Sequence, residues 1–261
     1  MSMKTLTELC GAPDHFMITA HRGASFEFPE NTALAMRHAV AAGADMIEFD
    51  LRGTADGIPV LLHDKTVDRT SNGHGAPEEH TLAELKDLNF SFFLQGIRRE
   101  TPAYDAVTIP TFEEILAEFR DSVAMNIQIY AKSDRLLEEI CRLFRAYDMY
   151  DRGYFMVSGE YVDRVRRIDP KIELCVARGW ESRSRPDMLR MAREQDHCRF
   201  SQPFRIYSTP ETYRLIRELG MRSNVFFCDE PDEMAELRRS GAQGILTNRI
   251  HLMCRNRALV S

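Results

Sequence analysis

Residues 17–75 have the sequence MITAHRGASFEFPENTALAMRHAVAAGADMIEFDLRGTADGIPVLLHDKTVDRTSNGHG, and they decide the fold. A short apolar strand, Met17–Ala20, ends immediately before His21. A helix is expected to begin at Asn31 or Thr32, because either side chain can cap its exposed amides. Gly43 then leads into a second strand. The sequence therefore predicts a strand, a helix and a strand, with His21 at the C-terminal end of the first strand.

The second strand, residues 45–51, carries two acidic side chains on one face. Side chains alternate along a strand, so Glu48 and Asp50 point the same way, about 7 Å apart. Two carboxylates in this arrangement repel each other unless a cation lies between them. The pattern predicts a metal site at Glu48 and Asp50, and the alternative is a solvated polar strand end.

A tight β-hairpin is expected after this strand, because residues 56–57 are Asp-Gly and have strand-like residues on both sides. With these two residues as the turn, Asp50 lies opposite His63. The hairpin is expected to return His63 to the two carboxylates, across from His21.

Strands and helices alternate through the rest of the chain. Helical stretches such as 133–147, 209–219 and 230–239 lie between most of the candidate strands, and this alternation favours a closed (β/α)8 TIM barrel over an open sheet. The candidate strands are 17–20, 45–50, 123–129, 153–157, 172–176, 197–201, 223–228 and 243–246.

Residues 64–108 interrupt the alternation and are too long for an ordinary loop. We interpret them as an insertion over the barrel mouth. The phenylalanines of its aromatic run, residues 90–93, pack it onto the barrel or, alternatively, contact substrate. The whole chain, 1–261, is expected to form one domain, as α/β barrels of this length do.

The composition is that of a soluble globular protein, with 44% hydrophobic and 28% charged residues. The net charge of −6 argues against a nucleic-acid partner. We expect no signal peptide and no membrane span, because no apolar stretch is long enough. The six cysteines show no CxxC spacing and are expected to be free thiols, which favours a cytoplasmic location. Homo-oligomerisation is left open.

An ordered set of motifs in this chain resembles the glycerophosphodiester phosphodiesterase family. The main motifs are AHRGAS (20–25), PENT (29–32), GADMIEFDLRGTADGIPVLLHD (43–64) and DRT (68–70). Weaker matches follow at IPTFEEIL (109–116), MNIQIY (125–130) and GAQGILTN (241–248). The resemblance implies a TIM barrel, a divalent metal (Mg²⁺ or Ca²⁺) and hydrolysis of a phosphodiester by two histidines.

The resemblance also implies roles for individual residues. His21 and His63 would exchange protons with the nucleophile and the leaving oxygen, for which an imidazole pKa near ~6.5 is suited. Glu48, Asp50 and Gln128 would be the metal ligands.

Four further residues are candidates for contact with the substrate or its phosphate: Arg22, Lys132, Arg178 and Trp180. Arg22 follows His21 and can hold a phosphate oxygen by bidentate hydrogen bonds. Arg178 and Trp180 follow the fifth strand, where they offer a donor fork and an aromatic face to a sugar or another alcohol. Trp180 is alternatively a plug between loops.

The chain departs from the family pattern near the third strand. Gln128 stands where glutamate is usual, and Tyr130 stands where lysine is usual. Mg²⁺ often binds through only one or two carboxylates, so we expect metal binding to be weakened but retained. Lys132 is a candidate replacement for the missing cation if the strand continues. Residues 226–227 (Phe-Phe) and 247–248 (Thr-Asn) also depart from the pattern, in the expected substrate pocket.

The leading prediction is a metal-dependent phosphodiester hydrolase that releases an alcohol and a phosphomonoester from a glycerol or sugar diester. Three alternatives remain open: an agrocinopine-like sugar phosphodiester hydrolase, a lyase that stops at a cyclic phosphate, and a barrel that binds phosphodiesters without turnover. A glycosidase is disfavoured, because its two carboxylates would flank a sugar from different strands.

Overall fold

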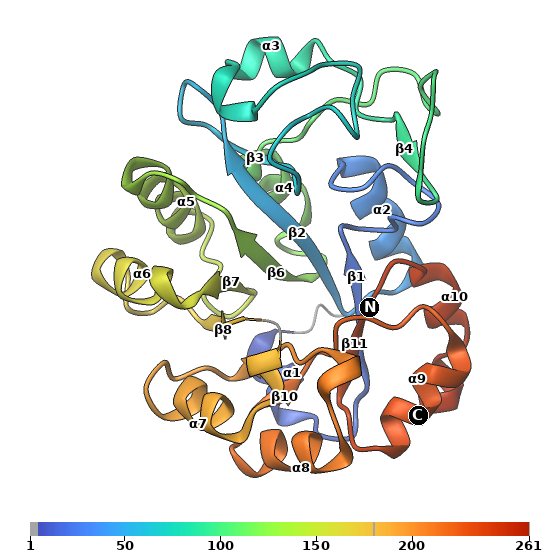
Figure 1. Ribbon diagram of the computed structural model, residues 1–261, viewed down its shortest axis with the longest axis vertical. Coiled ribbons are helices and arrows are strands. Elements are labelled where there is room, and N and C mark those ends of the chain that lie inside the picture. Colours follow the sequence, from blue (N-terminus) through green and yellow to red (C-terminus); the bar gives the residue numbers. More distant parts are fainter. Residues whose placement is uncertain (1–4, 180, 261) are drawn as a thin grey trace.

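Short parallel strands curve around a common centre in the computed structural model, which describes residues 5–179 and 181–260 (Figure 1). The strands are β1 (Met17–His21), β2 (Met46–Gly53), β6 (Ala124–Ile129), β7 (Gly153–Ser158), β8 (Leu174–Ala177), β9 (Phe200–Ser201), β10 (Arg222–Ser223) and β11 (Gly244–Thr247). One sheet has the order β11-β1-β2-β6-β7-β8, and β9 pairs in parallel with β10. Because β9 lies beside β8 and a bridge joins Val225 to Ile245 of β11, the ring closes. The predicted TIM barrel is confirmed.

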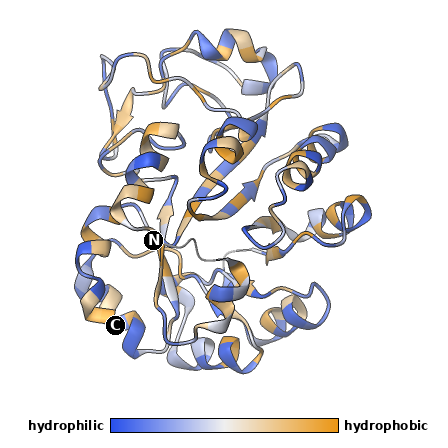
Figure 2. Ribbon diagram, turned by 180° about the vertical axis from the view of Figure 1, so that it is seen from behind, coloured by the Kyte–Doolittle hydropathy of each residue, from blue (hydrophilic) through white to orange (hydrophobic). Residues whose placement is uncertain are grey.

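A helix follows each of these barrel strands or its hairpin and packs on the outside of the barrel (Figure 1). Each outer helix carries both hydrophobic and hydrophilic residues, as expected for a helix with one buried face (Figure 2). Within the described residues, no helix is long and apolar enough to cross a membrane. The helices are α2 (Ala33–Ala42), α4 (Phe112–Phe119), α5 (Asp134–Ala146), α6 (Val162–Ile168), α7 (Pro186–Glu194), α8 (Pro210–Glu218), α9 (Pro231–Arg239) and α10 (Ile250–Arg255).

One end of the barrel is closed by α1 (Leu6–Gly11). Leu6 and Leu9 are fully buried and pack in one cluster with Met17 and Met46, the first residues of β1 and β2. This contact seals the N-terminal end of the strands. The opposite, C-terminal end is where TIM-barrel enzymes place their active sites.

The hairpin after β2 forms, but its predicted register is wrong by one residue. β2 pairs with β3 (Pro59–Leu61) so that Gly53 faces Pro59, and the Leu62 N–H donates to the Asp50 carbonyl. Asp50 therefore faces Leu62 and not His63. The loop has three residues, 55–57, instead of two, because Thr54 pairs with Ile58. The Thr54 N–H donates to the Ile58 carbonyl, and the Ile58 N–H donates to the Thr54 hydroxyl oxygen. Gly57, at φ 83°, supplies the left-handed residue that such a loop needs.

The inserted segment, residues 64–108, lies at one side of the ring, beside β3 and α2 (Figure 1), and contains η1 (Pro77–Glu79), α3 (Leu82–Lys86), β4 (Phe93–Leu94) and β5 (Ile97–Arg98). It has a small hydrophobic cluster of its own, in which Phe90 packs with Val60 and Leu85. Packing is therefore the role of Phe90. All six cysteines are free, as predicted.

Candidate active site

Residues at the C-terminal ends of the strands line a cavity of about 510 Å³, called here the mouth cavity. A neighbouring hollow of about 570 Å³ shares Arg22 and His63 with it. The two predicted catalytic histidines thus line one cavity although they come from different strands. The residues of the mouth cavity used below are His21, Arg22, His63, Gln128, Tyr130, Arg183, Gln202, Phe204 and Phe226.

His21 is the last residue of β1 and is almost buried, at 8% exposure. Its Nδ1 lies 2.7 Å from Oδ1 of Asn248, and the Asn248 amide donates to Asp229 over 2.7 Å. Because the amide oxygen is an acceptor, Nδ1 carries the proton and Nε2 is left with a lone pair. Burial, with the charge of Arg22, lowers the pKa of His21 to about 4. His21 is therefore neutral at pH 7 and able to accept a proton.

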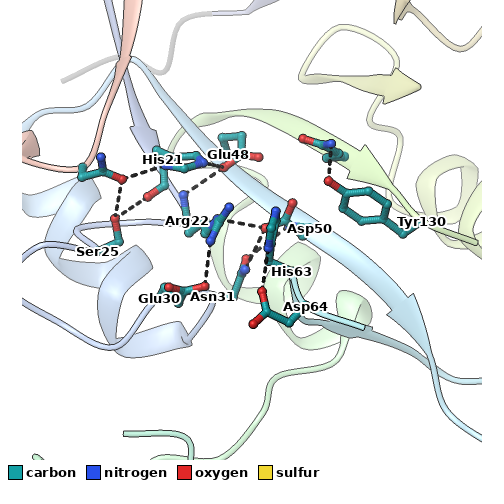
Figure 3. Close-up of polar contacts among 12 residues, drawn as sticks. His21, Arg22, Ser25, Glu30, Asn31, Glu48, Asp50, His63, Asp64 and Tyr130 are labelled. Carbon is teal, nitrogen blue, oxygen red and sulfur yellow. Dashed lines mark hydrogen bonds and ion pairs between the residues drawn. The ribbon is translucent and has the colours of Figure 1, made fainter. Parts of the chain in front are cut away.

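Glu48 and Asp50 lie side by side on β2, and both are buried (Figure 3). Glu48 Oε2 is 4.0 Å from His21 Nε2 and accepts the backbone N–H of Arg22 at 2.9 Å. Asn31 holds Asp50 from both sides, by donating to its carboxylate and accepting its N–H. Burial, and then repulsion from Asp50, raise the pKa of Glu48 well above its usual range. Arg22 pairs with Asp50 at 3.3 Å, so the carboxylate without a Lys or Arg ion pair among the described residues is that of Glu48, as expected at a cation site.

A chain of ion pairs joins this carboxylate pair to His63, and Figure 3 shows its two ends, Arg22 with Asp50 and Glu30, and Asp64 with His63. Arg22 contacts Asp50 at 3.3 Å and Glu30 at 2.9 Å. The Glu30 carboxylate also accepts two hydrogen bonds from the Arg69 guanidinium, which in turn donates to Asp64. Burial would raise the pKa of Glu30, but the hydrogen bonds and charges of both arginines lower it to about 2. Arg69 therefore connects the inserted segment to the site.

His63 follows β3 and is held by its neighbour Asp64, whose Oδ1 lies 2.8 Å from Nδ1 of the ring. The Arg52 guanidinium donates to the His63 carbonyl at 2.8 Å and 3.0 Å. With Nδ1 occupied by a carboxylate, Nε2 remains available to a substrate. His63 is thus held at Nδ1 by Asp64 and lines the mouth cavity.

Gln128 lies opposite Asp50 in the β2–β6 pairing, so it is next to the carboxylate pair as predicted. Its Nε2 donates to the Tyr130 hydroxyl over 2.5 Å. That bond leaves the amide oxygen of Gln128 unengaged. Tyr130 packs edge-on against His63, with ring centroids 6.0 Å apart, and burial raises its pKa. Tyr130 is therefore a neutral wall of the cavity.

Two of the predicted substrate contacts, Lys132 and Arg178, do not line the mouth cavity. Lys132 forms an ion pair with Glu78 at 3.0 Å and does not line the mouth cavity, so this position does not support a phosphate contact. Arg178 is likewise outside that lining, because Asp196 holds it by two hydrogen bonds. Trp180 lies outside the described residues. Arg22 does line the cavity.

Sequence reasoning missed the residue that orients His21. Asn248 follows β11, which pairs with β1 so that Thr247 faces Ala20. The next residue along therefore meets His21. In a closed barrel the first and last strands pair, and this pairing would have predicted that Asn248 lies beside His21. Arg183 was also missed.

The donors around Glu48, Asp50 and Gln128 are hard oxygens, which are the ligands that Mg²⁺ and Ca²⁺ prefer. Within residues 5–179 and 181–260, no group of three or more His, Cys, Asp or Glu side chains is arranged to hold a metal. A cation here would rely on two carboxylates, an amide oxygen and water. The counter-charge deficit at Glu48 fits such a cation.

Comparison with known proteins shows similarity along nearly the whole chain. The model of the "Glycerophosphoryl diester phosphodiesterase family" matches residues 21–252. A glycerophosphodiester phosphodiesterase of Caldanaerobacter subterraneus subsp. tengcongensis is 30% identical over 245 residues, covering 89% of this chain and 93% of that one. Another, from Bacillus subtilis, is 29% identical over 252 residues, covering 91% and 85%. A solved structure from Silicibacter pomeroyi, described as a glycerophosphoryl diester phosphodiesterase, has a TM-score of 0.80 at 19% identity and covers 97% and 96%.

Proposed function

This chain belongs to the glycerophosphoryl diester phosphodiesterase family, and we propose that it hydrolyses a glycerol- or sugar-linked phosphodiester to an alcohol and a phosphomonoester. The observation that carries the proposal is the pair of oppositely prepared imidazoles in one cavity. His21 is neutral and holds its proton on Nδ1, whereas His63 is paired with a carboxylate.

A phosphodiester resists hydrolysis because a nucleophile must approach negative charge and expel an alkoxide. We assign Mg²⁺ or Ca²⁺ to Glu48, Asp50 and the Gln128 oxygen, where the ion would neutralise the phosphoryl oxygens. His21 Nε2 accepts the proton of the attacking hydroxyl, and His63 Nε2 donates a proton to the leaving oxygen. Arg22, fixed by Glu30 and Asp50, presents its guanidinium to the same cavity and orients the phosphate.

The attacking hydroxyl comes from water or from a neighbouring hydroxyl of the substrate. In the second case a cyclic phosphate forms first and water then opens it. Phosphorus NMR of the products separates these routes: the proposed hydrolase ends at the phosphomonoester, and accumulation of the cyclic phosphate as the final product would identify a lyase instead.

The experiment that tests the proposal measures hydrolysis of glycerophosphodiesters and of bis(p-nitrophenyl) phosphate after chelation and after titration with Mg²⁺ or Ca²⁺. We expect metal-dependent turnover, and a loss of roughly 10²–10⁴-fold in His21→Ala and in His63→Ala. His74→Ala is the matched control, because its exposed ring pairs with Asp68 outside the cavity. Binding without turnover in the unmodified protein would support a non-catalytic barrel and refute the proposal.

A further inference from the structure

Arg183 is a cavity-lining cation that the proposed reaction does not use. It lies in η3 (Glu181–Ser184), after β8, and its side chain lines the mouth cavity. Its Nε is buried and has no hydrogen-bond partner among the described residues. Its guanidinium packs over Phe204, 4.8 Å from the ring centroid.

The charge of Arg183 lacks a counter-ion in the part of the chain that the structure describes. No carboxylate is among the ionisable groups that act on it, and its guanidinium forms no ion pair with an Asp or Glu side chain of the described residues. Burial lowers the pKa of Arg183. A half-buried cation without a partner is costly, and an anion brought by a ligand would offset that cost.

A second donor shares this wall of the cavity. Gln202 is 5% exposed, and its Oε1 accepts a hydrogen bond from Asn126 at 3.1 Å. Its own NH₂ group is not engaged by that bond, and the side chain lines the mouth cavity with Arg183. A guanidinium beside an amide N–H group suits the oxygens of a carboxylate or a phosphate.

This wall lies away from the carboxylate pair and His21, because the ionisable groups that act on the charge of Arg183 are Cys175 and Tyr130 and do not include Glu48, Asp50 or His21. The His21 and Phe226 ring centroids are 5.3 Å apart, and Phe226 lies 5.1 Å from Phe204, on whose face Arg183 packs. The reacting group must lie within hydrogen-bond reach of His21, about 3 Å. Arg183 therefore faces a different part of the substrate from the phosphodiester being cleaved.

We infer that the mouth cavity selects phosphodiesters whose alcohol carries a second oxyanion, a carboxylate or a phosphate monoester, held by Arg183 and Gln202. This inference rests on the proposed phosphodiester hydrolysis, and it makes Arg183 a specificity-determining residue. The contact addresses a group that does not react, so its effect falls mainly on KM.

Matched substrates test this directly. Glycerophosphoserine and glycerophosphoethanolamine differ by one carboxylate, and glycerophosphoinositol and its inositol monophosphate form differ by one phosphate. We expect the anionic member of at least one pair to be preferred by about tenfold or more in kcat/KM, as for a charge-assisted hydrogen bond. The pair that shows the preference tells whether a carboxylate or a phosphate is recognised.

Arg183→Met should abolish the preference while changing the rate on the less anionic member by less than about threefold, and Arg183→Lys should keep part of it. Arg185→Gln is the matched control: this arginine is exposed, pairs with Asp187 and does not line the cavity. Circular dichroism and Tm confirm folding, and Arg183→Gln replaces Arg183→Met if the latter does not fold.

Equal rates on both members of each pair in the unmodified protein would overturn the inference, as would an equal loss on both members in Arg183→Met. Calorimetric binding of the same four compounds to His21→Ala separates this outcome from failure of the proposed function. If none of the four compounds is hydrolysed, the hydrolase proposal fails. The role of Arg183 is then decided by binding: His21→Ala should bind the more anionic compound of a pair more tightly, and His21→Ala/Arg183→Met should bind both alike.

Discussion

A chain of hydrogen bonds determines what His21 can do. Asn248 accepts from Nδ1, and Asp229 holds Asn248 through both its side-chain and backbone N–H groups. Ser25 adds a bond to the His21 carbonyl. A ring held at Nδ1 cannot turn, so its Nε2 lone pair stays directed away from Asn248. Asn248 therefore sets both the tautomer and the orientation of the imidazole.

Asn248→Ala is expected to lower kcat by about tenfold to a hundredfold with little change in KM, because the ring loses its orientation and its tautomer preference. Steady-state kinetics on a glycerophosphodiester check this. Asn256→Ala is the control, since that amide bonds to the Leu252 carbonyl in the C-terminal helix region. An unchanged kcat in Asn248→Ala would show that the hydrogen bond does not position the ring.

The pH dependence of the rate follows from the buried position of His21. Burial and the charge of Arg22 lower its pKa to about 4, and a base must be unprotonated to work. Activity should therefore persist as pH falls from 7 to about 5 and decline only near the lowered pKa. A pH profile of kcat/KM measures this, with recovery at pH 7 as the test for acid unfolding. A decline centred near ~6.5 would indicate an unperturbed imidazole.

At the scale of secondary-structure elements, the turn between β1 and α2 places His21 and Arg22. Gly23 has φ 81°, and a Cβ there would lie 2.8 Å from both the backbone carbon and the Cβ of Ala35 in α2. Arg22 also has a positive φ, 56°, which directs its N–H to Glu48. The close approach of this turn to α2 therefore needs a residue without a side chain.

Gly23→Ala and Gly43→Ala separate backbone conformation from crowding. Gly43 caps α2 with φ 88°, and a Cβ there would meet nothing within 4 Å. Gly43→Ala should cost about 1 kcal/mol of unfolding free energy, from conformation alone. Gly23→Ala should cost about 1–3 kcal/mol more and impair catalysis, because α2 or the turn must move. Urea unfolding measures the loss of unfolding free energy in each variant, and kcat/KM measures the loss of activity. Equal losses of unfolding free energy in the two variants would mean that Ala35 moves aside without strain.

At the scale of the whole molecule, Asp45 ties the chain ends to the start of the barrel. It accepts the N–H of Ile18 in β1 at 2.9 Å, lies 2.9 Å from the His15 ring and pairs with Arg257 at 2.8 Å. Burial alone would raise the pKa of Asp45, but these partners lower it to about 2 from an ordinary 3.8. The carboxylate therefore stabilises the fold when it is charged.

Because the folded pKa of Asp45 is below the unfolded one, its contribution is complete above about pH 4 and is lost as pH falls toward 2. Asp45→Asn should lower the unfolding free energy by on the order of 2 kcal/mol at pH 7, and the difference should shrink toward pH 2. Chemical denaturation at several pH values measures this. Asp187→Asn, which breaks an exposed pair with Arg185, should cost little. A pH-independent Asp45→Asn difference would refute the linkage.

Much of this architecture was predictable from the amino-acid sequence, because it depends on local periodicity and turn chemistry. Apolar runs such as 17–20 and 153–157 became β1 and β7, and the expected helices 133–147 and 209–219 became α5 and α8, which Ser133 and Thr209 cap. Alternation along β2 also placed Glu48 and Asp50 on one face. The hairpin register was missed by one residue, because Gly57 allows a three-residue loop as readily as residues 56–57 suggest a two-residue one.

Only the tertiary structure decided which polar groups meet. Asn248 reaches His21 because the first and last strands pair. Lys132 forms an ion pair with Glu78 of the inserted segment and does not line the cavity. Arg183 faces the cavity because η3 turns inward after β8. Such contacts join residues far apart in the chain. Their partners depend on barrel closure and on competition between charges, which no local pattern of residues records.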